Sequence, residues 1–468
     1  MRKLFKRLIP FAFFVLVAFA PSLTRYIWRM GEMAGHEIEP GTISLYGMQL
    51  VAAAYVVLVF TTRTRTQWSG FLRRPEALSA AALAVIALVA SLRSDDPFSA
   101  TIAALTVVLG ALVFWAILLH RPDPHETVAL FFGAAVFQAA FGIQQFFTQE
   151  VTASKWLGTA AHTAADLGAF VVETLEGRWL RSYGLLPHPN VYGTLVALGL
   201  IAAIGLAGHR LVTAAERYRR ALAAAPQAGR YARLRLWARY SPLRFYAFMP
   251  FLAVGLLFSF SRSAFIAFAA GSAWLTVGAF SGSAPAVRRV LRPSAIIIAV
   301  SLIAMGLAFR DPLRVRATVD GRLEYQSVSS RFLQFADAWE LFSRHPIGGI
   351  GMNRMPYLVR LQVDSGRQWW EYDYIHDVPA LIAVETGLPG LVAWMAVAAL
   401  ALVAAWRRLR LRGPTLTGTT AFAAMFVALL VAGLFDHFLW SSWFGQLLFW
   451  VVLGMLHVAA EHANRPVK

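Results

Sequence analysis

Apolar and polar segments alternate along nearly the whole chain, and the apolar segments are long. A helix needs about 20 consecutive apolar residues to cross the hydrocarbon core of a bilayer, and about twelve segments approach that length. The pattern predicts an all-α polytopic membrane protein, because a spanning segment must satisfy its backbone hydrogen bonds internally. The predicted transmembrane helices lie at 8–23, 42–62, 75–92, 99–120, 127–147, 190–209, 245–260, 263–280, 294–309, 379–405, 416–435 and 443–460.

Composition narrows both the class of protein and its chemistry. Hydrophobic residues make up 58% of the 468 residues and charged residues 15%, whereas an average soluble domain carries about 25% charged residues. The sequence has no cysteine, which excludes disulfides, thiolate metal sites and a cysteine nucleophile. Histidine, carboxylates and arginine are left to carry any chemistry. No polar linker divides the chain, so we expect a single transmembrane domain over residues 1–468.

Basic residues predict how the chain lies in the membrane. Lys and Arg are retained preferentially in cytoplasmic loops, and most of the 43 basic residues fall in inner loops when the N-terminus is placed inside. Both termini are then cytoplasmic, as is a basic loop at 210–244. The loops at 148–189 and 311–378 are then periplasmic. The second is large, lies between the ninth and tenth predicted helices, and includes a predicted helix at 329–343.

The net charge and the first apolar segment each admit another interpretation. A net charge of +18 would suggest nucleic-acid binding in a soluble protein, but topology signals in the inner loops and contact with membrane lipids account for it here. We therefore expect no nucleic-acid partner.

Basic residues before an apolar run that ends at Ala18-Phe19-Ala20 resemble a signal peptide. We expect this segment to be kept as the first helix.

Three arginines from separate segments lie on the outer side of this topology. Arg262 stands in a short break between two apolar helices, where a charged group is costly unless it is paired or functional. Arg331 lies near the start of the helix predicted in the large loop, where helix amides and a guanidinium can act on one phosphate. Arg181 precedes a turn into the sixth helix, for which Asn190 is a suitable N-cap. Guanidinium groups bind phosphate oxygens in pairs, so the conjunction predicts a diphosphate site.

Each arginine also has a purely structural interpretation. Arg262 could fix its turn by extending its side chain toward the interface. Arg181 could pair with Glu173 or Glu176 in its own loop. Arg331 could simply lie on a solvated helix face. These alternatives stay open for each residue alone, whereas the three together favour a lipid-linked diphosphate sugar as substrate.

His376 is the strongest candidate for proton transfer, because imidazole exchanges a proton near neutral pH. It lies where the large loop enters the tenth predicted helix, on the same side as the arginines. Displacing a diphosphate from a sugar requires an activated hydroxyl, and a single base suffices because the leaving group departs as a stable anion. Asp377 or Glu385 is expected to orient the ring. The alternative is a hydrogen-bonded histidine that caps the helix, and the glycine-rich segment 345–351 is expected to be a structural turn.

The region from about residue 180 to 395 resembles the O-antigen ligase and polymerase superfamily of bacterial envelope glycosyltransferases. Each of the matching motifs is short, and their order and spacing carry the resemblance. The motifs are Arg181-x-x-Gly184 with His188-Pro189-Asn190, Ser261-Arg262-Ser263, Ser330-Arg331, His345-Pro346 with Gly348 to Gly351, His376-Asp377, and Glu385-x-Gly387-x-x-Gly390.

The resemblance implies a GT-C-like, inverting glycosyltransferase that needs no metal or other cofactor. It would sit in the bacterial inner membrane, with its active site facing the periplasm, and ligate O-antigen polysaccharide from undecaprenyl diphosphate to a sugar of lipid A-core. On this match His376 resembles the family's catalytic histidine, and Arg262 and Arg331 resemble its essential arginines. Asp377 departs from the Asn expected in many relatives, which leaves the hydrogen-bond partner of the histidine uncertain.

Several alternatives stay open beside a ligase. An O-antigen polymerase or a protein O-oligosaccharyltransferase of the same superfamily would share the chemistry and differ in acceptor. A metal-dependent transferase could use the acidic pairs Glu37/Glu39 or Glu371/Asp373, since hard cations bind oxygen ligands. A secondary transporter would show inverted repeats and broken helices at the bilayer midplane, and the apolar segments here are largely uninterrupted.

Overall fold

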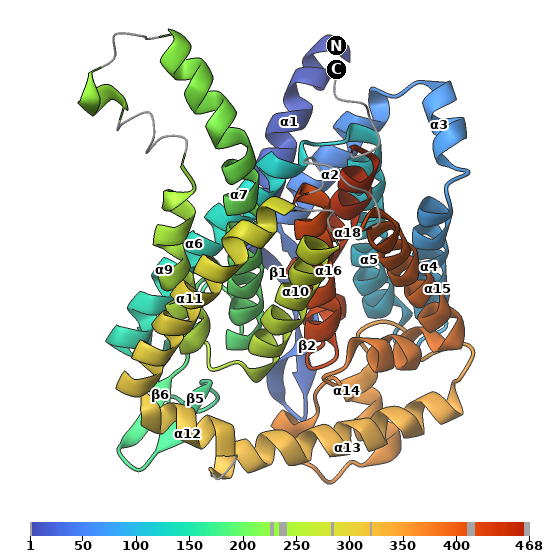
Figure 1. The fold of residues 1–468 in the computed structure, drawn as a ribbon. Coiled ribbons are helices and arrows are strands. Elements are labelled where there is room, and N and C mark those ends of the chain that lie inside the picture. Colours follow the sequence, from blue (N-terminus) through green and yellow to red (C-terminus); the bar gives the residue numbers. More distant parts are fainter. Residues whose placement is uncertain are drawn as a thin grey trace.

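Long helices form most of the protein. The computed structural model describes residues 2–224, 229–233, 241–281, 285–318, 321–409 and 417–462. Each apolar segment predicted above overlaps one long helix of the bundle (Figure 1). These helices are α1 (Arg2–Ala18), α2 (Gly47–Thr61), α4 (Pro75–Leu92), α5 (Pro97–His120), α6 (Pro124–Thr148), α7 (Pro189–Ala224), α9 (Leu243–Phe258), α10 (Arg262–Phe280), α11 (Pro285–Ala308), α15 (Val378–Leu409), α16 (Thr417–Gly433) and α18 (Trp443–His462).

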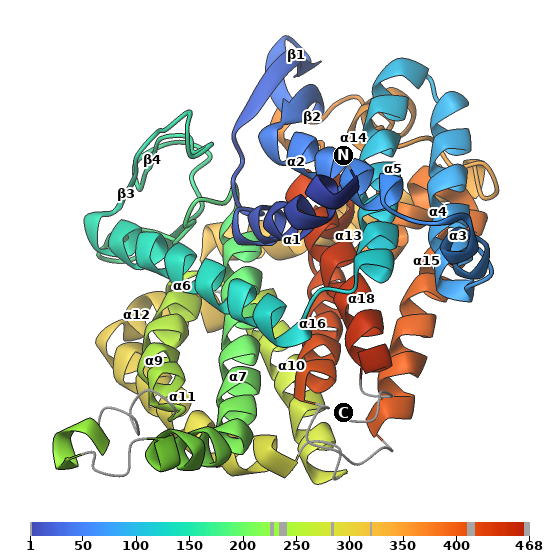
Figure 2. The ribbon, with the colours of Figure 1, turned by 90° about the horizontal axis from the view of Figure 1, so that it is seen from above.

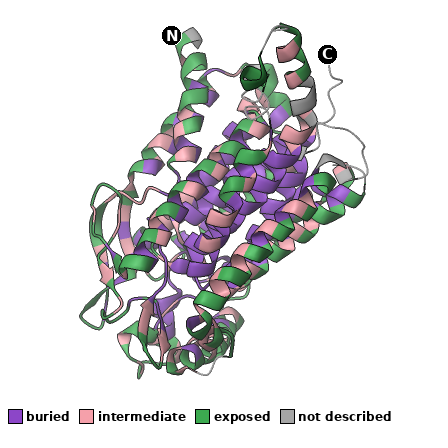
Figure 3. Cartoon of the chain, turned by 60° about the vertical axis from the view of Figure 1, so that its left-hand side comes forward, coloured by how far each residue is buried: buried purple, intermediate pink, exposed green. Residues whose placement is uncertain are grey.

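The helices support a protein embedded in a membrane. Within the described residues, 8 helices are long and apolar enough to cross a bilayer by length and composition. Three shorter apolar helices, α2, α9 and α16, accompany them. The count of twelve spans therefore remains a prediction. A helix that is apolar all round must be buried or face lipid, and both cases occur: the apolar parts of α7 and α18 are wholly buried in the bundle, whereas only 17% of the apolar part of α11 is buried. Buried residues gather in the middle of the bundle and exposed residues lie on its outside (Figure 3).

Small residues let the central helices approach closely. A Cβ on Gly110 of α5 would lie 2.2 Å from the ring of Trp450, and one on Gly142 of α6 would lie 2.2 Å from the Tyr192 hydroxyl. Close backbone approach at small residues is a main source of helix association in membranes, where dispersion contacts drive packing. These glycines therefore determine which helices pack against each other.

The prediction of an all-α protein is wrong for the loops at one end of the bundle. Antiparallel hairpins occur here, and two of them project beyond the helices in Figure 2. The predicted second span, 42–62, begins as a strand. In each hairpin the two strands pair their backbone groups with each other. The strands are β1 (Arg25–Met33) with β2 (His36–Tyr46), β3 (Glu150–Val151) with β4 (His162–Thr163), and β5 (Val171–Thr174) with β6 (Gly177–Leu180).

The segment between α11 and α15 covers one end of the bundle. Its helices α12 and α13 run along the end opposite the start of α1 (Figure 1). The helix predicted at 329–343 is present and longer than expected. The elements are α12 (Arg310–Thr318), α13 (Arg322–Arg344), α14 (Met355–Leu358), a π-helical turn (Val359–Val363) and a 3₁₀ turn (Trp369–Glu371); the remaining short helices of the chain are α3 (Arg65–Phe71) and α17 (Phe438–Ser441).

Parts of two topology predictions lie outside the described residues. In the predicted basic loop 210–244, α7 continues to Ala224, and residues 225–228 and 234–240 are not described. The prediction that both termini are cytoplasmic likewise falls partly on Met1 and 463–468, which are not described.

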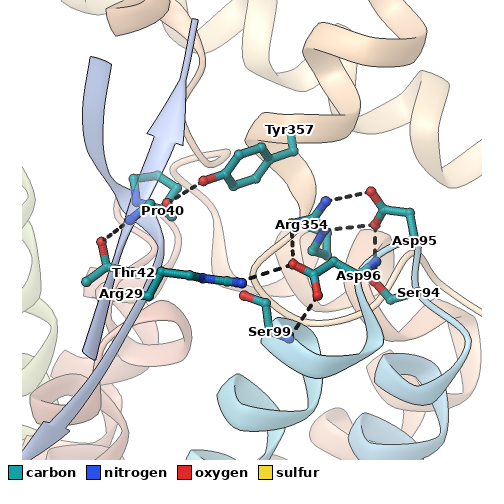
Figure 4. A network of polar contacts seen from close by, with 10 residues as sticks. Arg29, Pro40, Thr42, Ser94, Asp95, Asp96, Ser99, Arg354 and Tyr357 are labelled. Atoms are coloured by element: carbon teal, nitrogen blue, oxygen red, sulfur yellow. Dashed lines mark hydrogen bonds and ion pairs between the residues drawn. The ribbon is translucent and has the colours of Figure 1, made fainter. Parts of the chain in front are cut away.

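Arg354 ties the first hairpin to the bundle (Figure 4). Its guanidinium donates to both carboxylate oxygens of Asp95, at 2.8 and 2.5 Å, and lies 3.6 Å from Asp96. Asp96 also lies 3.4 Å from Arg29 of β1 and caps α5 through the backbone amide of Ser99. The hydroxyl of Tyr357 donates to the carbonyl oxygen of Pro40 on β2 at 2.9 Å. The loop before α5, the hairpin and α14 are thereby held together.

Candidate active site

A cavity of about 160 Å³ opens where α7, α10, α12 and α13 meet. Ligand sites for whole small molecules usually enclose about 300–1,000 Å³, so this space has the dimensions of an anion subsite within a larger surface. The guanidinium groups of three arginines, Arg262, Arg316 and Arg331, line it. The lining residues are Asn190, Arg262, Ser263, Ile266, Arg316, Arg331 and Phe435.

Arg262 reaches the cavity because the chain turns sharply between α9 and α10. Phe260 has a positive φ of 45°, and the hydroxyl of Ser261 caps α10 by accepting from the Ala264 amide at 3.3 Å. This cap makes Arg262 the first residue of α10, where the helix N-terminus adds partial positive charge. The side chain is 36% exposed and lies 3.5 Å from a carboxylate oxygen of Glu324.

Arg316 was not predicted from the sequence, although it completes the cationic wall. Its Nη1 donates to both carboxylate oxygens of Glu324 at 2.5 Å, and its Nε donates to the carbonyl oxygen of Phe260 at 2.9 Å. The Glu324 side chain is only 3% exposed, so its charge is compensated by Arg316 and Arg262. No local signal marks Arg316, because it lies in a run of arginines on α12 and its partner is on the next helix.

Arg181 stands behind the cavity wall. Its Nε donates to the carbonyl oxygen of Ser259 at 2.9 Å, and its Nη2 donates to the side-chain oxygen of Asn190 at 2.9 Å. Arg181 is 4% exposed and makes no ion pair with Glu173 or Glu176 among the contacts of the described residues. Arg181 is linked to the cavity by its hydrogen bond to Asn190, which is one of the lining residues.

Asn190 does not cap α7, contrary to the sequence prediction. The helix begins one residue earlier, at Pro189, and the ring of His188 accepts from the Asn190 backbone amide at 2.9 Å. The Asn190 side chain is therefore available to bridge: it accepts from Arg181 and donates from Nδ2 to Asp436 at 2.9 Å. It links the buried arginine to a buried carboxylate.

Asp436, which the sequence analysis did not single out, is that buried carboxylate. Burial would raise the pKa of Asp436, but three neighbouring histidines and the amide of Asn190 lower it to about 2. The charged form is therefore the one held in place. In the whole cluster, four arginines (Arg181, Arg262, Arg316 and Arg331) face two carboxylates, Glu324 and Asp436, which leaves an excess of positive charge suited to an anion.

His376 lies beside this cluster and is not one of the residues lining the cavity. Its Nδ1 is 2.9 Å from the side-chain oxygen of Gln334, and its ring stands perpendicular to the ring of His437, with centroids 5.1 Å apart. Burial lowers the pKa of His376, and His437 lowers it further. Gln334 follows Arg331 by three residues on α13, so the two side chains emerge from one face of that helix. One helix face thus adjoins both the cavity and the imidazole.

Asp377 has a different partner from the one expected. Its carboxylate accepts from the backbone amide of Ala380 at 2.8 Å and so caps the start of α15. The hydrogen-bond partner of His376 is Gln334, which lies 42 residues earlier in the chain. Asp377 fixes the direction in which α15 leaves the loop, immediately after the histidine.

Glu385, like Asp377, does not contact the ring of His376. It lies next to a break in α15 at Gly387, where segment 345–351 packs. Gly387 has φ 71° and ψ −177°, which interrupts the helix. Its amide neighbour Leu388 donates to the carbonyl oxygen of Pro346 at 2.8 Å, and Gly351 donates to the carbonyl oxygen of Glu385 at 2.9 Å. A Cβ on Gly387 would lie 2.3 Å from the carbonyl oxygen of Ile347. The Glu385-x-Gly387 motif is explained by this docking of the glycine-rich segment 345–351.

Replacing Glu385 by alanine is expected to destabilise the protein by about 2–6 kcal/mol. Its carboxylate, 1% exposed, accepts from the Asn353 amide at 2.7 Å and from the Trp440 indole at 2.8 Å. Each buried donor left without an acceptor costs about 1–3 kcal/mol. Thermal unfolding in detergent measures the change. Glu385→Gln keeps one acceptor oxygen and should show a smaller loss, and an unchanged unfolding temperature for Glu385→Ala would contradict the assignment.

Comparison with known proteins bears on the same part of the chain. No curated protein matches the sequence. Residues 247–395 match the model of a family described as O-antigen ligase. That stretch includes Arg262, Arg316, Arg331, Gln334 and His376 and ends after the break in α15. The match supports, over residues 247–395, the resemblance to the O-antigen ligase family that the sequence motifs indicate.

Proposed function

We propose that the protein is an O-antigen ligase, which transfers a polysaccharide from undecaprenyl diphosphate to a sugar hydroxyl of lipid A-core. Members of its family are glycosyltransferase-like enzymes of lipopolysaccharide assembly. The proposal places the protein in the bacterial inner membrane with the end covered by α12 and α13 facing the periplasm. The donor, the acceptor and the surrounding lipid are then its partners.

One observation carries the proposal: α13 presents Arg331 to the cationic cavity and Gln334 to His376. Side chains three residues apart on a helix lie about 5–6 Å from each other at Cβ. A phosphate held by the three guanidinium groups of the cavity is therefore adjacent to the imidazole. The transfer requires this arrangement, because the base must reach the acceptor hydroxyl while the diphosphate leaves from the same sugar carbon.

The hydrogen bond that His376 donates to Gln334 determines which nitrogen of the ring acts. An amide oxygen only accepts, so the proton of the neutral ring lies on Nδ1 and the lone pair on Nε2. We assign Nε2 as the base that removes the proton from the acceptor hydroxyl. The hydroxyl oxygen then forms a bond to the anomeric carbon, and the bond from that carbon to the diphosphate oxygen breaks with inversion. Its electron pair leaves on the diphosphate, where Arg262, Arg316 and Arg331 stabilise the added charge.

The reaction can be tested by reconstituting the purified full-length chain in lipid with an undecaprenyl diphosphate-linked polysaccharide. Three acceptors are offered separately: lipid A-core, a peptide, and a second lipid-linked donor. We expect polysaccharide to appear on lipid A-core. Transfer only to the second donor would identify a polymerase, transfer only to the peptide would identify a protein O-oligosaccharyltransferase, and either result would overturn the proposal. The same lipid without protein provides the baseline.

A further inference from the structure

Three possible metal ligands gather around the proposed base. Among the described residues, ligand atoms of Asp373, His376 and His437 all lie within 4.8 Å of one another. Asp373 precedes the histidine in the loop before α15, whereas His437 comes from the short loop between α16 and α17. The Nε2 of His437 is 4.0 Å from a carboxylate oxygen of Asp373. All three side chains are half-buried, so the group is both enclosed and accessible.

The hydrogen bonds of both rings leave the same nitrogen available. The Nδ1 of His376 is bonded to the side-chain oxygen of Gln334 at 2.9 Å, and the Nδ1 of His437 is bonded to the hydroxyl oxygen of Ser441 at 2.6 Å. The Ser441 hydroxyl donates to the carbonyl oxygen of His437 at 3.1 Å, so toward the ring it accepts. Both rings therefore carry the proton on Nδ1 and a lone pair on Nε2. Metal-binding histidines are oriented by outer partners of this kind.

Two other acidic residues of the predicted metal pairs, Glu39 and Glu371, are engaged elsewhere. Both carboxylate oxygens of Glu39 accept from Arg25, at 2.5 and 2.8 Å. The carboxylate of Glu371 accepts from the Gln368 backbone amide at 2.8 Å. The possible metal ligands that do lie together are two histidines and one carboxylate. Two imidazoles and one carboxylate suit Zn²⁺ and its neighbours in the first transition row, whereas Mg²⁺ and Ca²⁺ require oxygen ligands.

We infer that Asp373, His376 and His437 form an inhibitory site for a late first-row divalent cation such as Zn²⁺. The Nε2 atoms of the two histidines and one oxygen of Asp373 bind the ion and leave a fourth position open to water. The ion takes the Nε2 lone pair that would accept the proton of the acceptor hydroxyl. Binding therefore competes with transfer. The binding site stands on these contacts alone, and only its inhibitory effect rests on the proposed function.

Cobalt(II) titration of the purified full-length chain in detergent, without donor or acceptor, tests the site directly. Co²⁺ serves as a coloured probe of a zinc site, and we expect one equivalent to bind with a visible absorption that Zn²⁺ abolishes. Asp373→Asn and His437→Ala should each weaken binding by about 100-fold, and Ser441→Ala, which removes only an outer partner, by about tenfold. Glu371→Gln, an acidic residue of the same loop outside the group, is the matched control and should bind as wild type.

The binding experiment has a clear contrary result. Equal cobalt affinity in wild type, Asp373→Asn, His437→Ala and Ser441→Ala would overturn the site. Gel filtration of each variant shows whether it is folded, and Ser441→Ala keeps all three ligands if the other two variants fail that check. This readout needs no activity, so the site is judged even if transfer to lipid A-core is not found.

Zinc inhibition tests the second part of the inference. The transfer rate of each protein is measured against zinc concentration and divided by its own rate in chelator, so differences in basal rate do not matter. We expect zinc to inhibit wild type and Glu371→Gln alike, and Asp373→Asn to require about tenfold more zinc or higher. The same zinc sensitivity in Asp373→Asn as in wild type would show that zinc acts elsewhere, for example on the donor diphosphate, and would overturn the inhibitory role.

Discussion

Replacing His376 by alanine is expected to abolish transfer to lipid A-core while leaving donor binding largely intact. The change removes the Nε2 lone pair that we assign as base and leaves Arg262, Arg316 and Arg331 in the cavity. General-base catalysis contributes about 10²–10⁴-fold to rate, so kcat should fall by about that factor with little change in donor affinity. Single-turnover transfer and donor binding, measured on the same reconstituted protein, separate the two effects.

His345→Ala is the matched control, because this histidine is exposed and lies outside the cluster around the base. It should transfer at the wild-type rate. Gln334→Ala should lower kcat less than His376→Ala does, because the ring keeps its lone pair and loses the hydrogen bond that orients it. A His376→Ala protein that transfers as fast as wild type would remove the histidine from the mechanism.

Replacing Arg316 by alanine is expected to impair both stability and donor binding. Breaking a buried ion pair by removing one partner costs about 3–5 kcal/mol, and Glu324 keeps only the longer contact to Arg262 at 3.5 Å. The cavity also loses one of its three guanidinium groups, so donor affinity should fall by at least about tenfold. Thermal unfolding and donor titration in the same detergent measure the two losses.

Arg314→Ala provides the control for that experiment, since Arg314 is an exposed arginine two residues earlier on α12. It should unfold and bind donor as wild type. Glu324→Gln distinguishes pairing from phosphate binding: it removes the negative charge and leaves all three arginines, so donor binding should persist. Normal donor affinity in Arg316→Ala would show that this arginine serves Glu324 alone.

The helices could be predicted from the sequence because apolar segment length reflects the bilayer, a constraint that acts locally. All twelve predicted segments overlap a helix. The hairpin β1–β2 was missed because hydropathy assigned the apolar end of β2 to the following helix. Its pairing depends on bulges and on Tyr357 from α14, which no window of sequence contains.

The candidate site could be predicted only in part, for a related reason. Arg262 and Arg331 stood out because charge is rare at the edge of apolar segments, and the structure places both in one cavity. Glu324, Gln334 and Asp436 gave no local signal, since each acts on a residue from a different element. Residues that orient a side chain or neutralise its charge can be recognised only from their contacts, and these contacts join residues that are far apart in the sequence.

The docking of segment 345–351 into the break of α15 makes a rigid joint between two helices. α13 ends at Arg344, and the residues that follow are hydrogen bonded on both sides of Gly387. Arg331 of α13 is therefore linked to α15 through this joint, and Arg316 and Arg262 are linked to α13 through Glu324. The arginines and the imidazole are thereby supported by connected elements, so on the proposed function we expect the base to be aligned before the donor binds.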